Sequence, residues 1–396
     1  MTTEPGRVPD AELRRILNLI YDDAERDGFA GWDPYDGLNG RLFRSTPLFR
    51  IPFARQAWIQ LVKRAPFNLR PLTFQKPEVL AKGVSLFAMG AWRLAGAGGV
   101  DNTDAPRWRA RGAALLTRLE SLRSPGWDEI CWGYPYDWQS RAFFQPRDCP
   151  NLICSVFGAM AFERRTDGGD AAAIPDEVAR FVMQTLSRTE DGIGYITYTP
   201  TTNTRVHNVN MLGAALLARS AKRTGNARLA DFARESMRFS VDLLKPNGSW
   251  PYGESPNQAW VDNFHTGYNL VALEDYRRTT GDTSMDPALE RAYRYWDTTF
   301  FKPDGAPSYY DNSHWPIDIH CSAQAILTWL ALRRLDPNAA AKAHRTAAWT
   351  LKHMWNGRHF TFQRGAWWRN DVKQIRWGQA WMFWALSELA TVELTS

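Results

Sequence analysis

One short segment of the chain gathers the residue types that acid–base chemistry needs. Asp262, Asn263, His265 and Tyr268 lie close together in sequence, and Trp260 precedes them. A histidine can take or give a proton near neutral pH, a carboxylate can orient it, and a phenol can carry a second proton. Helix capping would explain one of the pair Asp262 and Asn263, but not the whole set. The segment is therefore our first candidate for a catalytic site.

A second carboxylate, Asp318, follows Asp262 by 56 residues and stands two residues before His320. Two carboxylates that face one site can divide the roles of acid and base, because their surroundings separate their pKa values. Both could equally cap helices at equivalent points of a repeat. The candidate catalytic residues are His265, Tyr268, Asp262, Asp318, His207 and His320.

Further polar and aromatic residues lie in the segments that precede other apolar runs. Arginine can hold a carboxylate or phosphate through two parallel hydrogen bonds, and an indole face can stack on a sugar ring. For Arg141 an ion pair with Asp137, four residues earlier, is an equally good explanation. The candidate substrate-binding residues are Asp137, Arg141, Arg205, Asn208, Tyr252, Glu254, Trp260, Asn263, Trp315, Arg376, Trp377 and Gln379.

A repeat of 56 residues underlies these positions. Apolar runs that predict buried helices begin near 151, 207, 263 and 319, and each ends at a helix stop. The stops are Gly169, Gly225, Gly281 and Pro337. Two further apolar runs, at 77–94 and from 377 onward, raise the number of predicted inner helices to six.

Six segments with a single apolar stripe separate these runs and predict outer helices. They lie at 12–27, 108–122, 177–186, 229–243, 289–300 and 339–355. Alternating inner and outer helices predict an all-α (α/α)6 toroid, a single domain over 1–396 with long loop insertions at about 28–75 and 125–150. An open helical solenoid is the alternative, but its repeats are usually shorter.

The connections between outer and inner helices contain Asp-Gly or Asn-Gly pairs, which predict short β-hairpin-like loops. In a toroid all six connections lie on one face, where six helix N-termini point at a central funnel and favour an anion.

The composition excludes several classes. The chain of 396 residues is 44% hydrophobic, so it folds, and its net charge of +6 is too mild and dispersed to imply nucleic acid. Its four cysteines form no CxxC pair, and no phosphate-binding glycine motif is present, so we expect neither a metal nor another cofactor. The start carries no signal-peptide pattern and no long apolar run follows, so we expect a cytoplasmic protein, with peripheral membrane association left open.

Five segments together resemble a known family. They are 132–141, 205–208, 262–268, 317–320 and 376–381, the first reading Trp-Gly-Tyr-Pro-Tyr-Asp-Trp-Gln-Ser-Arg. The pattern resembles proteins of the VpsJ type, which are encoded in bacterial and archaeal exopolysaccharide and capsule clusters. The resemblance covers nearly the whole chain and implies a role in polysaccharide metabolism, without naming a reaction.

A narrower resemblance links 262–268 to the helical domain of D-glucuronyl C5-epimerases, with Phe264 in place of a tyrosine. Toroidal uronate lyases use a similar set of Asn, His, Tyr and Arg, for which Asn263, His265, Tyr268 and Arg205 would be the counterparts. Unsaturated glucuronyl hydrolases share the toroid and use acidic residues instead.

These observations favour an enzyme that acts on an acidic, uronate-containing glycan or lipid-linked oligosaccharide by removing the proton at C5, as a lyase or an epimerase. Arg205 and Asn263 would neutralise the sugar carboxylate. The alternatives are a glycoside hydrolase with Asp262 and Asp318 as its acid pair, and a non-catalytic glycan-binding scaffold. An isoprenoid cyclase ranks last, because a DxDD motif is missing.

Overall fold

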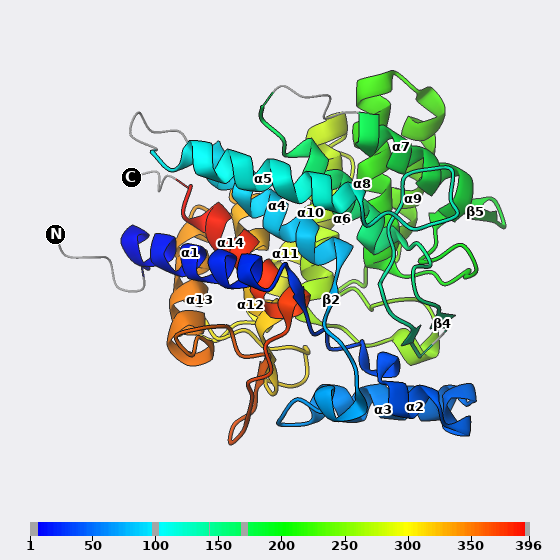
Figure 1. The fold of residues 1–396 in the computed structure, drawn as a ribbon. Helices are drawn as coiled ribbons and strands as arrows, with labels where there is room; N and C mark the ends of the chain where they lie inside the picture. The colour runs from blue at the N-terminus through cyan, green and yellow to red at the C-terminus, as the bar shows by residue number, and fades with distance from the viewer. Residues whose placement is uncertain (1–6, 97–102, 142, 168–172, 393–396) are drawn as a thin grey trace.

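The computed structural model describes residues 7–96, 103–141, 143–167 and 173–392, so the predicted stop at Gly169 lies outside the described residues. Six inner helices form a ring in which each packs against the next and α14 packs against α4 (Figure 1). The inner helices are α4 (Ala81–Ala95), α6 (Leu152–Glu163), α8 (His207–Thr224), α10 (Asn263–Thr280), α12 (Ile319–Ala331) and α14 (Trp381–Leu389). The contact between first and last closes the ring and confirms the predicted toroid over the open solenoid.

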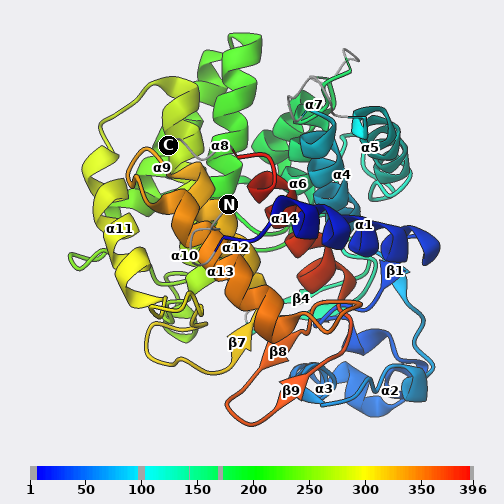
Figure 2. The ribbon, with the colours of Figure 1, turned by 90° about the vertical axis from the view of Figure 1, so that its left-hand side faces the viewer.

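Six outer helices surround this ring, as Figure 2 shows for α9, α11 and α13. They are α1 (Asp10–Arg26), α5 (Ala105–Glu120), α7 (Ala173–Phe181), α9 (Ala227–Asp242), α11 (Asp286–Thr299) and α13 (Ala339–Met354). Each presents one apolar face to the ring and a charged face to solvent, as the stripes in the sequence predict.

Local signals explain where the inner helices start and stop. Asn151 and Asp262 accept a hydrogen bond from the backbone N–H three residues later, which satisfies a donor that a helix start leaves free. Gly225 and Gly281 take left-handed φ values of 69° and 76° directly after α8 and α10. Helix α12 instead ends at Ala331, before the predicted stop at Pro337, because the chain turns there and the Leu335 N–H donates to the Leu332 carbonyl.

The connections form the predicted short hairpins. Strands β5 (Ser187–Glu190) and β6 (Ile193–Ile196) pair antiparallel across Asp191-Gly192, and β3 (Trp138–Gln139) pairs with β4 (Phe144–Gln145). A three-stranded sheet has the order β7-β8-β9. Its strands are β7 (Ile317–Asp318), β8 (Gln363–Arg364) and β9 (Arg369–Asn370).

The insertion predicted as a long loop at about 28–75 contains helices. Strands β1 (Ala30–Gly31) and β2 (Glu78–Val79) pair at its base, and helices α2 (Arg41–Arg44) and α3 (Pro52–Arg64) lie between them, on the hairpin side of the ring (Figure 1). Only two residues of α3 are buried, so the helix leaves no strong apolar stripe in the sequence. The amide of Asn370 donates to the carbonyls of Lys63 and Ala65, which ties the end of α3 to β9.

Gly305 lets its loop pack closely against the following outer helix. Gly305 has a φ of 92°, and a Cβ there would lie 2.9 Å from the backbone of Arg345 in α13. Thr346 of the same helix donates its hydroxyl to the Gly305 carbonyl. By contrast, Gly357 has a similar φ of 93° with open space around it. Substitution of Gly305 and Gly357 therefore distinguishes the free-energy cost of the positive φ value from the cost of the close approach to α13.

We expect Gly357→Ala to lower the free energy of unfolding by about 1–2 kcal/mol, because an L-residue is strained at this φ. Gly305→Ala should cost roughly 3 kcal/mol, since the methyl group must also displace a helix backbone. Urea denaturation of both variants checks this. Equal losses would mean that the contact with Arg345 adds nothing.

Candidate active site

The first two residues of each inner helix face opposite ways. At the first position, His207 lies against Ser240 of α9, and the Asn263 amide bonds to Trp296 of α11, so both point outward to an outer helix. Phe264 and His320, at the second positions of α10 and α12, lie together instead, with ring centroids 4.7 Å apart. Lys82 is the second residue of α4, and Arg376 is the second residue of the π-helical turn Ile375–Ala380 that leads into α14. Successive residues of a helix are rotated by about 100°, so this division repeats with the 56-residue period.

His265 and Asp262 form a hydrogen-bonded pair at the start of α10. Asp262 Oδ2 lies 2.6 Å from His265 Nδ1 and also accepts from Trp260 Nε1, while Oδ1 caps the helix through the His265 backbone. A carboxylate only accepts, so the proton of the neutral imidazole sits on Nδ1 and the lone pair sits on Nε2. The His265 side chain is 22% exposed and that of Asp262 is 1% exposed. This pair is arranged as a general base with a carboxylate that orients it.

Tyr268 and His320 form a second pair directly behind the first. The Tyr268 hydroxyl lies 2.6 Å from His320 Nε2, and both side chains are buried. Burial raises the pKa of Tyr268 and lowers the pKa of His320, so the phenol remains protonated and the imidazole remains neutral. The Tyr268 ring centroid lies 6.1 Å from that of His265. Three of the candidate catalytic residues thus come together with Asp262 at one place.

Lys82, which the sequence analysis missed, lies in the same centre. Its ammonium nitrogen is 4.2 Å from the ring centroid of Phe157, 5.0 Å from that of Trp381 and 5.6 Å from that of Tyr268. The residue is 3% exposed. Burial lowers the pKa of Lys82 well below its usual range, and the Arg376 cation lowers it further. Only the closed ring brings these partners together, because they come from three other inner helices.

Arg376 also reaches the centre, but its charge is already balanced. Its Nε and NH2 both lie 2.6 Å from Asp33 Oδ2, and Tyr136 donates to Asp33 Oδ1. The guanidinium lies 5.3 Å from the ring centroid of Tyr134. This fully buried ion pair ties the 28–75 insertion to the last inner helix, and Asp33 was not among the predicted residues.

Asp318 is fully buried, and both of its carboxylate oxygens are occupied. Oδ1 accepts from the His320 backbone and from Trp377 Nε1, and Oδ2 accepts from Gln363 Nε2. Burial raises the pKa of Asp318 despite these donors and the Lys63 cation. The structure therefore places this carboxylate as a helix cap that also holds Trp377, whose ring lies 4.3 Å from that of His320.

Aromatic rings line one side of the exposed His265 imidazole. Tyr252 and Trp260 stack with centroids 4.6 Å apart, and Tyr252 lies 4.5 Å from the His265 ring. The exposed Arg141 guanidinium lies 4.9 Å from the Trp260 ring. The suggested ion pair of Arg141 with Asp137 is replaced by one between Arg44 and Asp137 at 3.1 Å.

Several predicted binding residues point away from the ring centre. Arg205 forms ion pairs with Glu190 and Glu254, and it lies over the ring of Phe239 on outer helix α9. The Gln379 amide exchanges two hydrogen bonds with the backbone of Phe360. Asn208 is buried, and its Oδ1 has no partner among the described residues.

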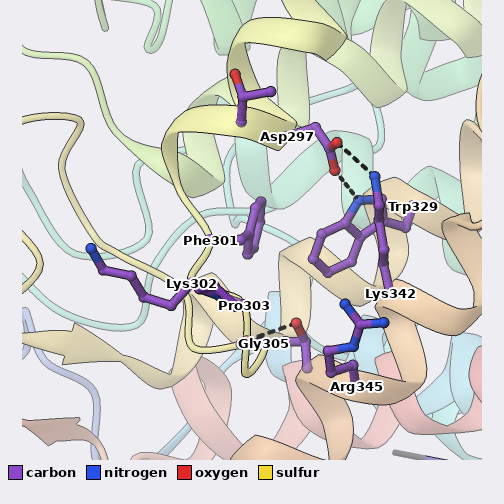
Figure 3. Close-up of a pocket in the computed structure, with 10 residues that line it drawn as sticks. Asp297, Phe301, Lys302, Pro303, Gly305, Trp329, Lys342 and Arg345 are labelled. Atoms are coloured by element: carbon purple, nitrogen blue, oxygen red, sulfur yellow. Dashed lines mark hydrogen bonds and ion pairs between the residues drawn. The ribbon is translucent and has the colours of Figure 1, made fainter.

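A cavity of about 320 Å³ lies outside this centre, on the outer surface near the ends of α11 and α13. Figure 3 shows Asp297 there, bonded to Trp329 and paired with Lys342. A neighbouring cavity of about 450 Å³ takes in Trp315, which is 38% exposed and lies apart from the His265 pair. Both cavities share Lys302.

Within the described ranges, no group of three or more His, Cys, Asp or Glu side chains could hold a metal ion. The same part of the chain contains no helix long and apolar enough to cross a membrane.

Comparison with protein-family models gives no match, and neither does comparison with curated protein sequences. Solved structures do match. A sugar epimerase from a ruminal bacterium aligns with a TM-score of 0.65 at 10% identity, over 96% of this chain and 98% of that one. The chain has the (α/α)6 toroid fold. Cellobiose 2-epimerase from Bacillus thermoamylovorans B4167 aligns with this toroid at 0.61 and 9% identity, over 79% and 88% of the two chains. An unsaturated glucuronyl hydrolase specific for heparin aligns at 0.55 and 10%, over 80% and 88%.

The outward placement of His207 predicts an effect on stability. Burial lowers its pKa to about 4, against 6.5 for an ordinary histidine. Between these values the unfolded chain binds the proton more tightly, so the stability that neutral His207 contributes is present above pH 6.5 and is lost as the pH falls toward 4. The loss amounts to about 3 kcal/mol.

His207→Gln should remove this term, so its free energy of unfolding should fall less between pH 7 and pH 4, by about 3 kcal/mol, than that of the parent protein. Denaturant titrations at both pH values measure the difference. Parallel pH profiles for the two proteins would show that the imidazole is not buried as described.

Proposed function

We propose that this protein is a carbohydrate-active enzyme that moves protons at C5 of a uronate unit in an acidic glycan, as a lyase or an epimerase. The observation that carries the proposal is the contact between two acid–base pairs at the ring centre. Asp262 and His265 make up the partly exposed pair, and Tyr268 and His320 make up the buried one. Their protonation states are complementary, since His265 offers a lone pair and Tyr268 offers a proton.

The chemistry follows from these states. His265 Nε2 takes the proton from C5, and the electron pair left behind is delocalised into the adjacent carboxylate. In a lyase this pair forms the C4–C5 double bond and expels the C4 oxygen, which takes a proton from Tyr268. In an epimerase Tyr268 returns a proton to C5 from the other face. When Tyr268 gives up its proton, a neutral His320 in the Nε2–H tautomer can donate a hydrogen bond to the phenolate oxygen.

Hydrolysis by paired carboxylates receives less support. A hydrolase of that kind needs two carboxyl groups that flank the scissile bond. Asp318 is fully buried with three donors on its oxygens, and Asp262 is bound to His265. Each would have to give up its present partners before it could contact a sugar.

The substrate class rests on three kinds of support. The stacked rings of Tyr252 and Trp260 offer a platform beside His265, as sugar-binding sites commonly do. Structures with the same fold are named as sugar epimerases and as an unsaturated glucuronyl hydrolase specific for heparin. The resemblance of the sequence to VpsJ-type proteins supports a role in exopolysaccharide metabolism, with a lipid-linked oligosaccharide as one form of the substrate.

Proton NMR in deuterated water tests the proposal with a panel of uronate-containing oligosaccharides. We expect deuterium at C5 for an epimerase, or a vinyl proton at C4 for a lyase. His265→Ala should slow the change by about 10²- to 10⁴-fold, because it removes the base. His353→Gln on outer helix α13 is the matched control and should keep the parent rate.

Other spectral changes would contradict the proposal. A new reducing end with neither a vinyl proton nor deuterium incorporation would show a hydrolase, and deuterium at C2 of a reducing sugar would show an epimerase of another class. Glycan binding without turnover by parent and variant alike would favour the scaffold.

A further inference from the structure

The site as described lacks an obvious partner for the substrate's anionic group. Arg205 and Asn263, which the sequence suggested for this role, face outer helices and are already bonded. Arg376 faces the centre, but its charge is neutralised by Asp33. A bound carboxylate near His265 needs a cation that is not already paired.

Lys82 meets this need. The nitrogen lies over three aromatic faces, and none of the described residues forms a hydrogen bond or an ion pair with it. Aromatic faces attract a cation but leave its three N–H donors unsatisfied, which is costly in a buried place. The residue begins α4, so it also lies where six helix N-termini converge, and their dipoles favour an anion.

We propose that Lys82 binds the carboxylate of a uronate unit at the ring centre and thereby holds C5 of that unit beside His265 and Tyr268. This inference rests on the proposed function and specifies how its substrate is recognised. Two buried polar atoms at the starts of inner helices α8 and α14 support the presence of a polar ligand. The Asn208 Oδ1 and the Trp381 Nε1 have no partner among the described residues, and they could respectively accept from and donate to a sugar hydroxyl.

A carboxylate fits this place better than a phosphate. The Lys82 ammonium is a single charge, and its surroundings at Phe157, Tyr268 and Trp381 are flat aromatic faces with few donors. A phosphate dianion would need several more donors to replace its hydration. A carboxylate on a sugar ring needs fewer, and the rest of the ring can lie against the aromatic faces.

The test measures binding, so it does not depend on turnover. Isothermal titration of the full chain with D-glucuronate and with a glucuronate-containing tetrasaccharide should show binding, whereas the glucuronate methyl ester and inorganic phosphate should bind far more weakly. Lys82→Met keeps a similar length without the charge and should raise the Kd for the acids by about 10- to 100-fold. Lys302→Met, which removes an exposed lysine of the outer cavities in Figure 3, is the control and should leave the Kd unchanged.

A second readout reports the lysine itself. Burial makes the free Lys82 amine easy to deprotonate, so a bound carboxylate should draw a proton from solution. Titration at pH 8 in two buffers of different ionisation heat should show uptake of up to about one proton by the parent protein and none by Lys82→Met. Three facing groups have pKa values that burial shifts away from this pH: burial raises those of Cys154 and Tyr268 and lowers that of His320. Asp33 raises the pKa of the facing Arg376, with which it forms an ion pair.

Thermal melting controls for folding. Lys82→Met should melt at the same temperature as the parent or higher, since it removes a buried amine that has no hydrogen-bond partner among the described residues. Equal acid binding by parent and Lys82→Met would overturn the inference, as would no binding of either acid by the parent, or binding of phosphate in place of both acids. Lys82-dependent binding with neither deuterium at C5 nor a vinyl proton at C4 would support this inference and contradict the proposed function instead.

Discussion

Closure of the inner ring is the constraint on which the rest of the structure depends. The packing of α14 against α4 forces six helices to start on one face with their N-termini converging. Each start leaves backbone N–H groups without partners, and the aligned dipoles add partial positive charge. Asn151, Asp262 and Asp318 each accept a hydrogen bond from one of these N–H groups and so cap their own helices. The positive potential of the helix starts is directed at the ring centre, where Arg376 and Lys82 also lie.

Arg376 and Lys82 differ in the partners that surround them. Arg376 is paired with Asp33, which the 28–75 insertion brings over the ring, and Tyr136 holds the other oxygen of that carboxylate. A buried ion pair of this kind fixes where Arg376 lies but adds little to the free energy of folding, because the desolvation of both charges offsets much of their attraction. Lys82 has only aromatic faces around its charge. The protein thus carries, in the same centre, one cation with an ion-pair partner and one lysine with none among the described residues.

Asp262 shows how capping and chemistry share one residue. One oxygen satisfies the start of α10, and the other orients His265, so the helix that needs a cap also sets the imidazole. Asp318 lies at the equivalent point of the next unit, and both of its oxygens accept hydrogen bonds that hold the surrounding structure. The difference lies in the neighbours. Gln363 of β8 and Trp377 reach Asp318, whereas the second oxygen of Asp262 is left for His265 and Trp260.

The sequence by itself determined the architecture. A 56-residue period, helix stops such as Gly225 and Gly281, and turn pairs such as Asp191-Gly192 are local signals that neighbouring residues fully specify. The sequence also identified the segment around His265, because the capping Asp262, the base His265 and the phenol of Tyr268 all lie within two turns of one helix.

Tertiary structure decided which of those residues face one another. A rotation of about 100° per residue separates Asn263, which turns outward, from Phe264, which turns inward, and composition does not reveal that difference. Lys82 is the second residue of α4, as His320 is of α12, but the 125–150 insertion between α4 and α6 lengthens the 56-residue spacing that would have aligned them. Its partners come from α6, α10 and α14, so its environment exists only when the ring is closed. Contacts between residues far apart in sequence depend on packing and not on local pattern, and the centre of this protein consists of such contacts.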